Sequence, residues 1–62
     1  MKAELTGRER EVAALLIEGR TSKQIGKALD ISHRTADIYR ARLMRKFNAA
    51  TTAELVQRLL AA

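Results

Sequence analysis

Residues 22–47 constrain the fold of this 62-residue chain more than any other stretch. Within each half of the stretch, apolar or small residues recur at the helical spacing of three or four. These positions are Ile25, Gly26, Leu29, Ala36, Tyr39, Leu43 and Phe47. The phase jumps between Asp30 and Ser32, where Asp tolerates the left-handed conformation of a sharp turn and Ser can cap the next helix. Gly26 allows two helices to cross closely. The stretch therefore predicts a helix-turn-helix.

The second helix of this motif has two different sides. On a helical wheel of about 100° per residue, Ala36, Leu43 and Phe47 fall together and predict a core face. The opposite side, with Asp37 at its edge, carries Arg34, Ile38, Ala41, Arg42 and Arg45. Arginines beside a short Ala41 suit contacts to guanine edges or to phosphates. The alternative is a solvated basic face on an ordinary small bundle.

Positive charge is concentrated on this helix. The chain carries 12 basic and 7 acidic residues, a net charge of +5. Residues 33–46 hold five of the basic residues and only one acidic residue, Asp37. Localised positive charge opposite a core face indicates nucleic-acid binding. An acidic protein or an anionic lipid is the alternative partner, although a lipid-binding helix would need larger apolar residues than Ile38 and Ala41.

Composition excludes several other classes. The chain has no Cys and one His, so we expect no disulfide, metal site or cofactor. No apolar run approaches the roughly 18 residues of a membrane span, and Met1–Glu4 is no signal peptide, so we expect a cytoplasmic protein. No catalytic triad, carboxylate pair or phosphate loop is recognisable, and we expect no enzyme. His33, at an exposed helix start, is interpreted as solvated or as contacting a phosphate.

The whole chain, residues 1–62, reads as one all-α domain. It contains no Pro and three Gly, and helix-forming residues dominate. After a short lead-in over residues 1–5, capping boxes are predicted to begin three helices at Thr6, Thr21 and Thr51, with Glu or Gln three residues later. Ser32 caps the remaining helix. The predicted helices of this compact four-helix domain span about 7–18, 22–29, 33–47 and 52–61.

The ordered set of these segments resembles a known family. LTGREREVAALLIEG, TSKQIGKALDIS and RTADIYRARLMRKF resemble the LuxR/FixJ-type (GerE-type) helix-turn-helix domain over residues 5 to about 60. The DISxRTxxxxRAxxMxK stretch is closest to the FixJ-like response regulators. The resemblance implies sequence-specific binding of double-stranded DNA for bacterial transcription regulation. The chain would be the output domain of a two-component response regulator, separated from an N-terminal receiver or ligand domain, or a free-standing small regulator.

The resemblance also implies roles for individual residues. Positions that reach base edges in the family match Asp37, Ile38, Ala41 and Arg42, and positions that meet phosphates match Ser22, Lys23, Thr35 and Lys46. Asp37 has an alternative, because it can pair with Arg34 or Arg40 three residues away. Tyr39 is expected to be buried with its hydroxyl at the rim, where it can contact a phosphate.

The fourth helix is the family's contact between two domains on DNA. Its apolar residues cover an arc of about 160°, whereas covering one side of a small bundle needs about 100°. We therefore expect the Leu55 edge to be exposed and to form a homodimer contact with Leu59, pairing two domains on an inverted repeat. The alternative is that Leu55 packs under the first helix.

Two further functions compete with the main one. A promoter-reading domain of a sigma factor has a similar pattern, but that domain usually ends with the recognition helix, and this chain continues into a capped fourth helix. A protein-interaction module could instead use the basic face to bind an acidic partner.

Overall fold

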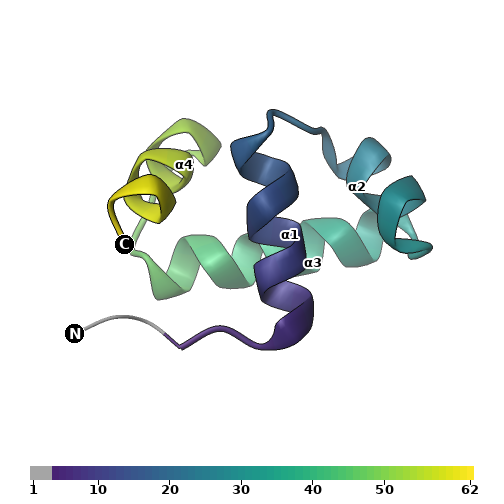
Figure 1. Cartoon of the computed structure of the whole chain (residues 1–62), viewed down its shortest axis with the longest axis horizontal. Helices are drawn as coiled ribbons and strands as arrows, with labels where there is room; N and C mark the ends of the chain where they lie inside the picture. The colour runs from purple at the N-terminus through teal and green to yellow at the C-terminus, as the bar shows by residue number, and fades with distance from the viewer. Residues whose placement is uncertain (1–3) are drawn as a thin grey trace.

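The computed structural model describes residues 4–62, which form four α-helices (Figure 1). The helices are α1 Gly7–Ile17, α2 Ser22–Leu29, α3 His33–Lys46 and α4 Thr52–Ala61. This confirms the predicted all-α, four-helix architecture, with α1 and α3 each ending one residue earlier than expected. Residues 1–3 of the predicted lead-in lie outside the described residues. In Figure 1, α1 crosses in front of α3, with α2 and α4 on either side of α1.

The predicted capping boxes form at the first two helices. The N–H of Glu9 donates to Oγ1 of Thr6 at 3.2 Å, and the N–H of Thr6 donates to Oε1 of Glu9 at 2.9 Å. Thr21 and Gln24 make the same pair of bonds at 3.2 and 2.9 Å. Each box satisfies N–H groups that the first turn of a helix leaves without partners.

At α4 the predicted capping box is only half formed. The N–H of Glu54 donates to Oγ1 of Thr51 at 3.1 Å, but Oε1 of Glu54 accepts from the N–H of Ala50 rather than from that of Thr51. The φ angle of Thr51 is −135°, compared with −70° at the Thr6 cap. The backbone at Thr51 is thus more extended than at Thr6, and the box prediction was wrong in that one bond.

The turn between α2 and α3 depends on a close backbone approach. Asp30 has the left-handed φ of 56° that the turn requires, and the N–H of Thr35 donates to Oγ of Ser32 at 3.1 Å, which confirms the predicted cap. A Cβ atom on Gly26 would lie 2.7 Å from the carbonyl oxygen of Ile31. The two helices can therefore cross here because residue 26 has no side chain.

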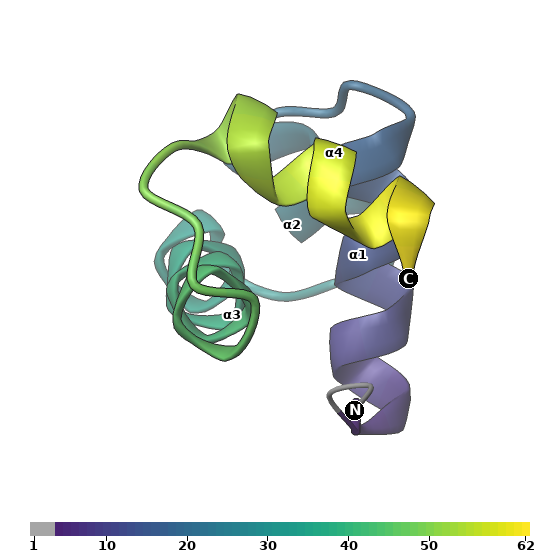
Figure 2. The same cartoon turned by 90° about the vertical axis from the view of Figure 1, so that its left-hand side faces the viewer.

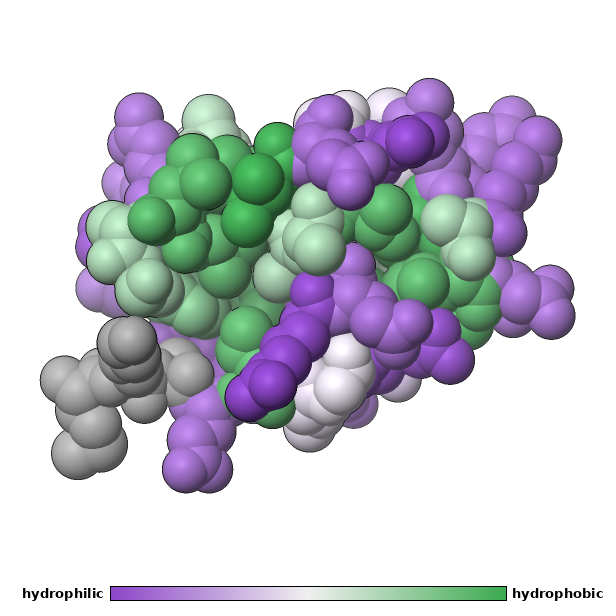
Figure 3. Space-filling model, in the orientation of Figure 1, coloured by the Kyte–Doolittle hydropathy of each residue, from purple (hydrophilic) through white to green (hydrophobic). Residues whose placement is uncertain are grey.

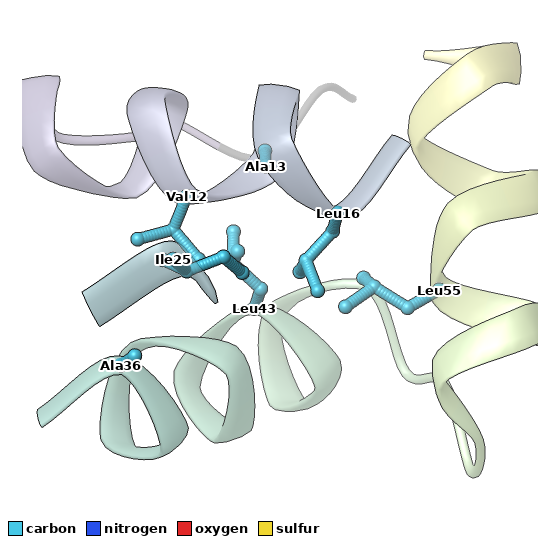
Figure 4. Close-up of a cluster of buried hydrophobic side chains, with 7 residues drawn as sticks. All are labelled: Val12, Ala13, Leu16, Ile25, Ala36, Leu43 and Leu55. Carbon is cyan, nitrogen blue, oxygen red and sulfur yellow. The ribbon is translucent and has the colours of Figure 1, made fainter. Parts of the chain in front are cut away.

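The core contains residues from every helix (Figure 4). Its buried members are Val12, Ala13, Leu16, Ile25, Ala36, Leu43 and Leu55. In Figure 4, Leu55 points from α4 toward Leu16 of α1 and Leu43 of α3. Partly buried apolar side chains, including Tyr39 and Phe47, pack around this cluster.

The expectation that Leu55 is exposed was wrong, because its exposed fraction is 0%. The helix packs against both α1 and α3, so the face it buries is centred on Leu55 and the apolar surplus lies elsewhere on the helix. The exposed large residue of α4 is Leu60, at 66%, and Leu59 is half-buried.

We expect Leu55→Ala to lower the free energy of unfolding by about 2–4 kcal/mol, because it leaves a cavity at the centre of the core. Leu60→Ala is the matched control, and as a surface change it should shift the value by at most about 0.5 kcal/mol. Urea denaturation followed by circular dichroism measures both. Equal losses in the two variants would contradict the burial of Leu55.

Candidate nucleic-acid interface

The outer side of α3 is not covered by the other helices. The inner side of α3 faces the core through Ala36 and Leu43, which are both fully buried. Figure 2 looks nearly along α3, and α1, α2 and α4 all lie above it or to its right. The opposite side of the longest helix is therefore free to meet another molecule.

We call this free surface the α3 outer face. It consists of the exposed residues Arg34, Ile38, Ala41, Arg42 and Arg45. Ile38, predicted to point away from the core, is 48% exposed. None of the acidic side chains in residues 4–62 forms an ion pair with an arginine of this face. As predicted, the face combines guanidinium groups that have no carboxylate partner within residues 4–62 with the apolar side chains of Ile38 and Ala41.

Arg42 is stacked on its neighbour Tyr39. Its guanidinium carbon lies 5.6 Å from the centroid of the Tyr39 ring, within cation–π range. Tyr39 is half-buried beside the core, so its ring gives the arginine a firm support. Because the stacking already restricts the side-chain conformations of Arg42, this residue loses less conformational entropy when it contacts a base.

Asp37 is engaged within the chain. Its Oδ1 accepts hydrogen bonds from Oγ of Ser22 and, at 3.0 Å, from Nη2 of Arg40. Nε2 of His33 lies 3.7 Å from Oδ2. The bond from Ser22, followed by that from Arg40, lowers the pKa of Asp37 below its ordinary value. Of the two pairings considered for Asp37, the structure contains the one with Arg40, and base reading by Asp37 stays a prediction.

Arg40 connects α3 to α4. Its Nη1 donates to Oγ1 of Thr52 at 2.9 Å, while its Nη2 donates to Asp37. The spacing of Asp37 and Arg40 is visible in the sequence, but the bonds to Ser22 and Thr52 were not predicted. These two bonds span 15 and 12 residues of sequence. Only the fold brings such partners together.

The residues expected to meet phosphates lie in different surroundings. Because Ser22 reaches Asp37, the N-terminal end of α2 lies beside the middle of α3, and Lys23 is exposed next to it. The hydroxyl of Thr35 lies 2.9 Å from that of Ser32, at the start of α3. These side chains border the α3 outer face, and their phosphate contacts stay predictions.

Lys46 binds a buried carboxylate of α1. Its Nζ donates to Oε1 of Glu9 at 2.7 Å and to the carbonyl oxygen of Glu4 at 2.9 Å. Glu9 is only 2% exposed. The bond from Lys46, followed by that from the N–H of Thr6, lowers the pKa of Glu9 below the ordinary value of 4.5. A phosphate contact by Lys46 would have to share or leave this carboxylate.

Other kinds of site are not found in the described part of the chain. Within residues 4–62, no group of three or more His, Cys, Asp and Glu side chains is arranged to hold a metal ion. None of the helices there has the length and apolar character that crossing a membrane requires. The α3 outer face, with its three exposed arginines, is therefore the candidate functional surface.

A positively charged helix that is presented by a tight turn defines the class of helix-turn-helix DNA-binding domains. A family model described as bacterial regulatory proteins, luxR family, matches residues 3–59. The chain belongs to this family.

Similar proteins agree with this assignment. The chain is 42% identical to the tetrathionate response regulatory protein TtrR of Salmonella typhimurium over 55 residues, which is 89% of the chain. It is 46% identical to the transcriptional regulatory protein FixJ of Bradyrhizobium diazoefficiens over 55 residues, again 89% of the chain. The chain spans 27% of the length of each of these two relatives.

A solved structure has the same fold. The LuxR-type receptor VqmA of Vibrio cholerae superposes with a TM-score of 0.93 at 35% identity, over 97% of this chain and 27% of that one. VqmA is a dimer that shows a large conformational shift in the absence of its target DNA.

We expect Glu9→Gln to lower the free energy of unfolding by about 1–2 kcal/mol at neutral pH, because Lys46 loses a buried counter-charge but, at 37% exposed, remains partly solvated. The folded-state pKa of Glu9 lies below the unfolded value, so the unfolded chain binds more protons between the two. Stability from Glu9 is therefore full above about pH 5 and is lost as pH falls through the folded-state pKa.

Urea denaturation at a series of pH values measures this effect. Glu9→Gln should show a shallower loss of stability on acidification than the parent chain. The control is Glu11→Gln, whose carboxylate is exposed and should change stability little. Parallel pH profiles for Glu9→Gln and the parent chain would refute the role given to Glu9.

Proposed function

We propose that this domain binds double-stranded DNA sequence-specifically and thereby regulates transcription, with α3 in the major groove. The α3 outer face is the observation that carries the proposal. A major groove of about 12 Å admits an α-helix, and its base edges are read by hydrogen bonds and apolar contacts. Arginine forks match the acceptors of guanine, and short apolar side chains allow close approach.

The residues of the face divide by position. Arg42 lies near its centre beside Ala41, so we propose that Arg42 contacts bases, with Ile38 and Ala41 against thymine methyl groups. Arg34 and Arg45 lie toward the two ends of α3 and can reach bases or the backbone. Lys23, on the neighbouring end of α2, suits a phosphate.

The wider protein is also a proposal. Relatives named as response regulators, and the short span of each that this chain covers, support an output domain that works with a receiver domain or a ligand-binding domain. Duplex DNA as partner implies a cytoplasmic location. The family match over residues 3–59, which includes most of α4, supports this function over a sigma-factor promoter domain.

We expect Arg42→Ala to weaken binding to the preferred duplex by about 1–3 kcal/mol and to relax base preference at one position, because a bidentate base contact is lost. Binding-site selection followed by titration of the selected and random duplexes measures both effects. Arg8→Ala, which removes an arginine of α1 outside the α3 outer face, is the matched control and should leave the preference unchanged.

The same titrations at several salt concentrations separate DNA binding from the docking of an acidic protein. With about four to six phosphate contacts, log K should fall with log salt at a slope of about −4 to −5. Absence of measurable affinity for duplex DNA at low salt would reject the proposed function and favour the protein-interaction alternative.

We propose in addition that α4 pairs two domains on DNA. In Figure 3, apolar side chains gather over the region of α4 at the upper left. Leu60 is the exposed large member, and Val56 and Leu59 are half-buried beside it. A helix that meets its own copy makes a two-fold contact, which suits an inverted repeat. The small size of the patch favours monomers in the absence of DNA.

We expect Leu60→Glu to abolish cooperative binding to an inverted repeat while binding to a single half-site and helix content persist, because Leu60 is already exposed in the monomer. Electrophoretic mobility shifts on one and two half-sites measure the difference. Gln57→Glu is the control, with the same charge added on an exposed polar residue of the same helix. Unchanged cooperativity in Leu60→Glu would exclude this surface as the contact.

A further inference from the structure

A continuous series of polar contacts connects three helices. Ser22 of α2 donates to Asp37 of α3, Arg40 donates to the same carboxylate at 3.0 Å, and Arg40 also donates to Thr52 of α4 at 2.9 Å. We call these four residues the interhelical polar network. It joins the start of α2, the middle of α3 and the start of α4.

The Oδ1 atom of Asp37 is poorly available to a DNA base, although the side chain as a whole is 41% exposed. Its Oδ1 already accepts from a hydroxyl and a guanidinium, and His33 lies 3.7 Å from Oδ2. Turning the group toward a cytosine would break these bonds, and each partner left without an acceptor has a desolvation cost. An unpaired carboxylate beside DNA phosphates would also be repelled, whereas pairing with Arg40 compensates its charge.

Arg40 is in turn held in one orientation. Both of its terminal nitrogens donate hydrogen bonds, and its Nε is buried without a hydrogen-bond partner in residues 4–62. The guanidinium is thus partly removed from solvent and depends on Asp37 for its counter-charge. Without that charge, Arg40 would be drawn to a nearby phosphate and would release Thr52.

We propose that Asp37 is a positioning residue, which fixes α3 relative to α2 and α4 through the interhelical polar network, and that it does not read a base. The inference rests on the proposed DNA-binding function. Asp37 sets the angle at which the α3 outer face is presented, and Arg40 extends that constraint to the helix proposed to pair two domains.

A measurement without DNA tests the contact itself. Urea midpoints are compared for the parent chain, Ser22→Ala, Asp37→Ala and the double variant. If Ser22 acts through Asp37, the double variant unfolds at the same urea concentration as Asp37→Ala alone. Additive shifts would overturn the proposal, because contacting residues that work as a unit are not additive. Should Asp37→Ala fail to fold, the cycle is run with Asp37→Asn, which keeps one acceptor and is judged by the same criterion.

A measurement with DNA distinguishes positioning from base reading. Base preference at every position of the selected site is compared for the parent chain, Asp37→Ala, Ser22→Ala and Glu11→Ala, the last removing an equal charge from α1. Positioning predicts that Asp37→Ala lowers discrimination by a similar factor at all positions and that Ser22→Ala does the same. A loss of about 5–150-fold confined to one base pair, absent in Ser22→Ala, would identify Asp37 as a base reader and overturn the proposal. If the parent chain binds no duplex, the proposed function fails, and the urea cycle still decides the role of Asp37 in the fold.

Discussion

The close approach of α2 to the turn before α3 is the constraint on which the rest of the structure depends. A side chain at Gly26 would meet the backbone oxygen of Ile31 at 2.7 Å, and Asp30 must adopt a φ of 56° for the chain to turn there. A domain of about this size buries only about 60% of its unfolded surface, so it has few apolar contacts with which to correct a misplaced helix. The backbone geometry at the turn therefore fixes the crossing of α2 and α3. The remaining two helices then cover one side of α3 only.

Polar bonds supplement this small core at two points of α3. Near its middle, Asp37 and Arg40 connect it to α2 and α4, and at its end Lys46 binds Glu9 of α1. Arg40 and Lys46 are therefore ion-paired within the molecule, whereas Arg34, Arg42 and Arg45 form no ion pair within residues 4–62. The net charge counted along residues 33–46 therefore overstates the number of positive side chains on α3 that are available to DNA. These three arginines of α3 all lie on the α3 outer face, so the surface available for DNA recognition is narrower than the helix that carries it.

Local patterns predicted most of the fold. The predicted helix starts were correct because the N-caps at Thr6, Thr21 and Ser32 act over three residues of sequence, and the predicted C-terminal ends were correct to within one residue. The outward orientation of Ile38 followed from helical periodicity alone.

Contacts between helices could not be predicted in the same way, since Glu9 and Lys46 are 37 residues apart in sequence. The width of an apolar arc likewise does not say which of its residues is central, and for α4 that depends on both α1 and α3. Leu55 was assigned to the wrong side for this reason.

The burial of Leu55 changes how α4 can act. One face of the helix is committed to the core, and Arg40 bonds the side chain of its first residue, Thr52. The helix therefore cannot turn freely to suit a partner. If two copies meet along the edge that carries Leu60, the direction of each α3 is set by the same contacts that hold α4 in its own domain. The distance between two recognition helices would then be a property of the folded domain, determined before DNA is bound, and it would select inverted repeats of one spacing.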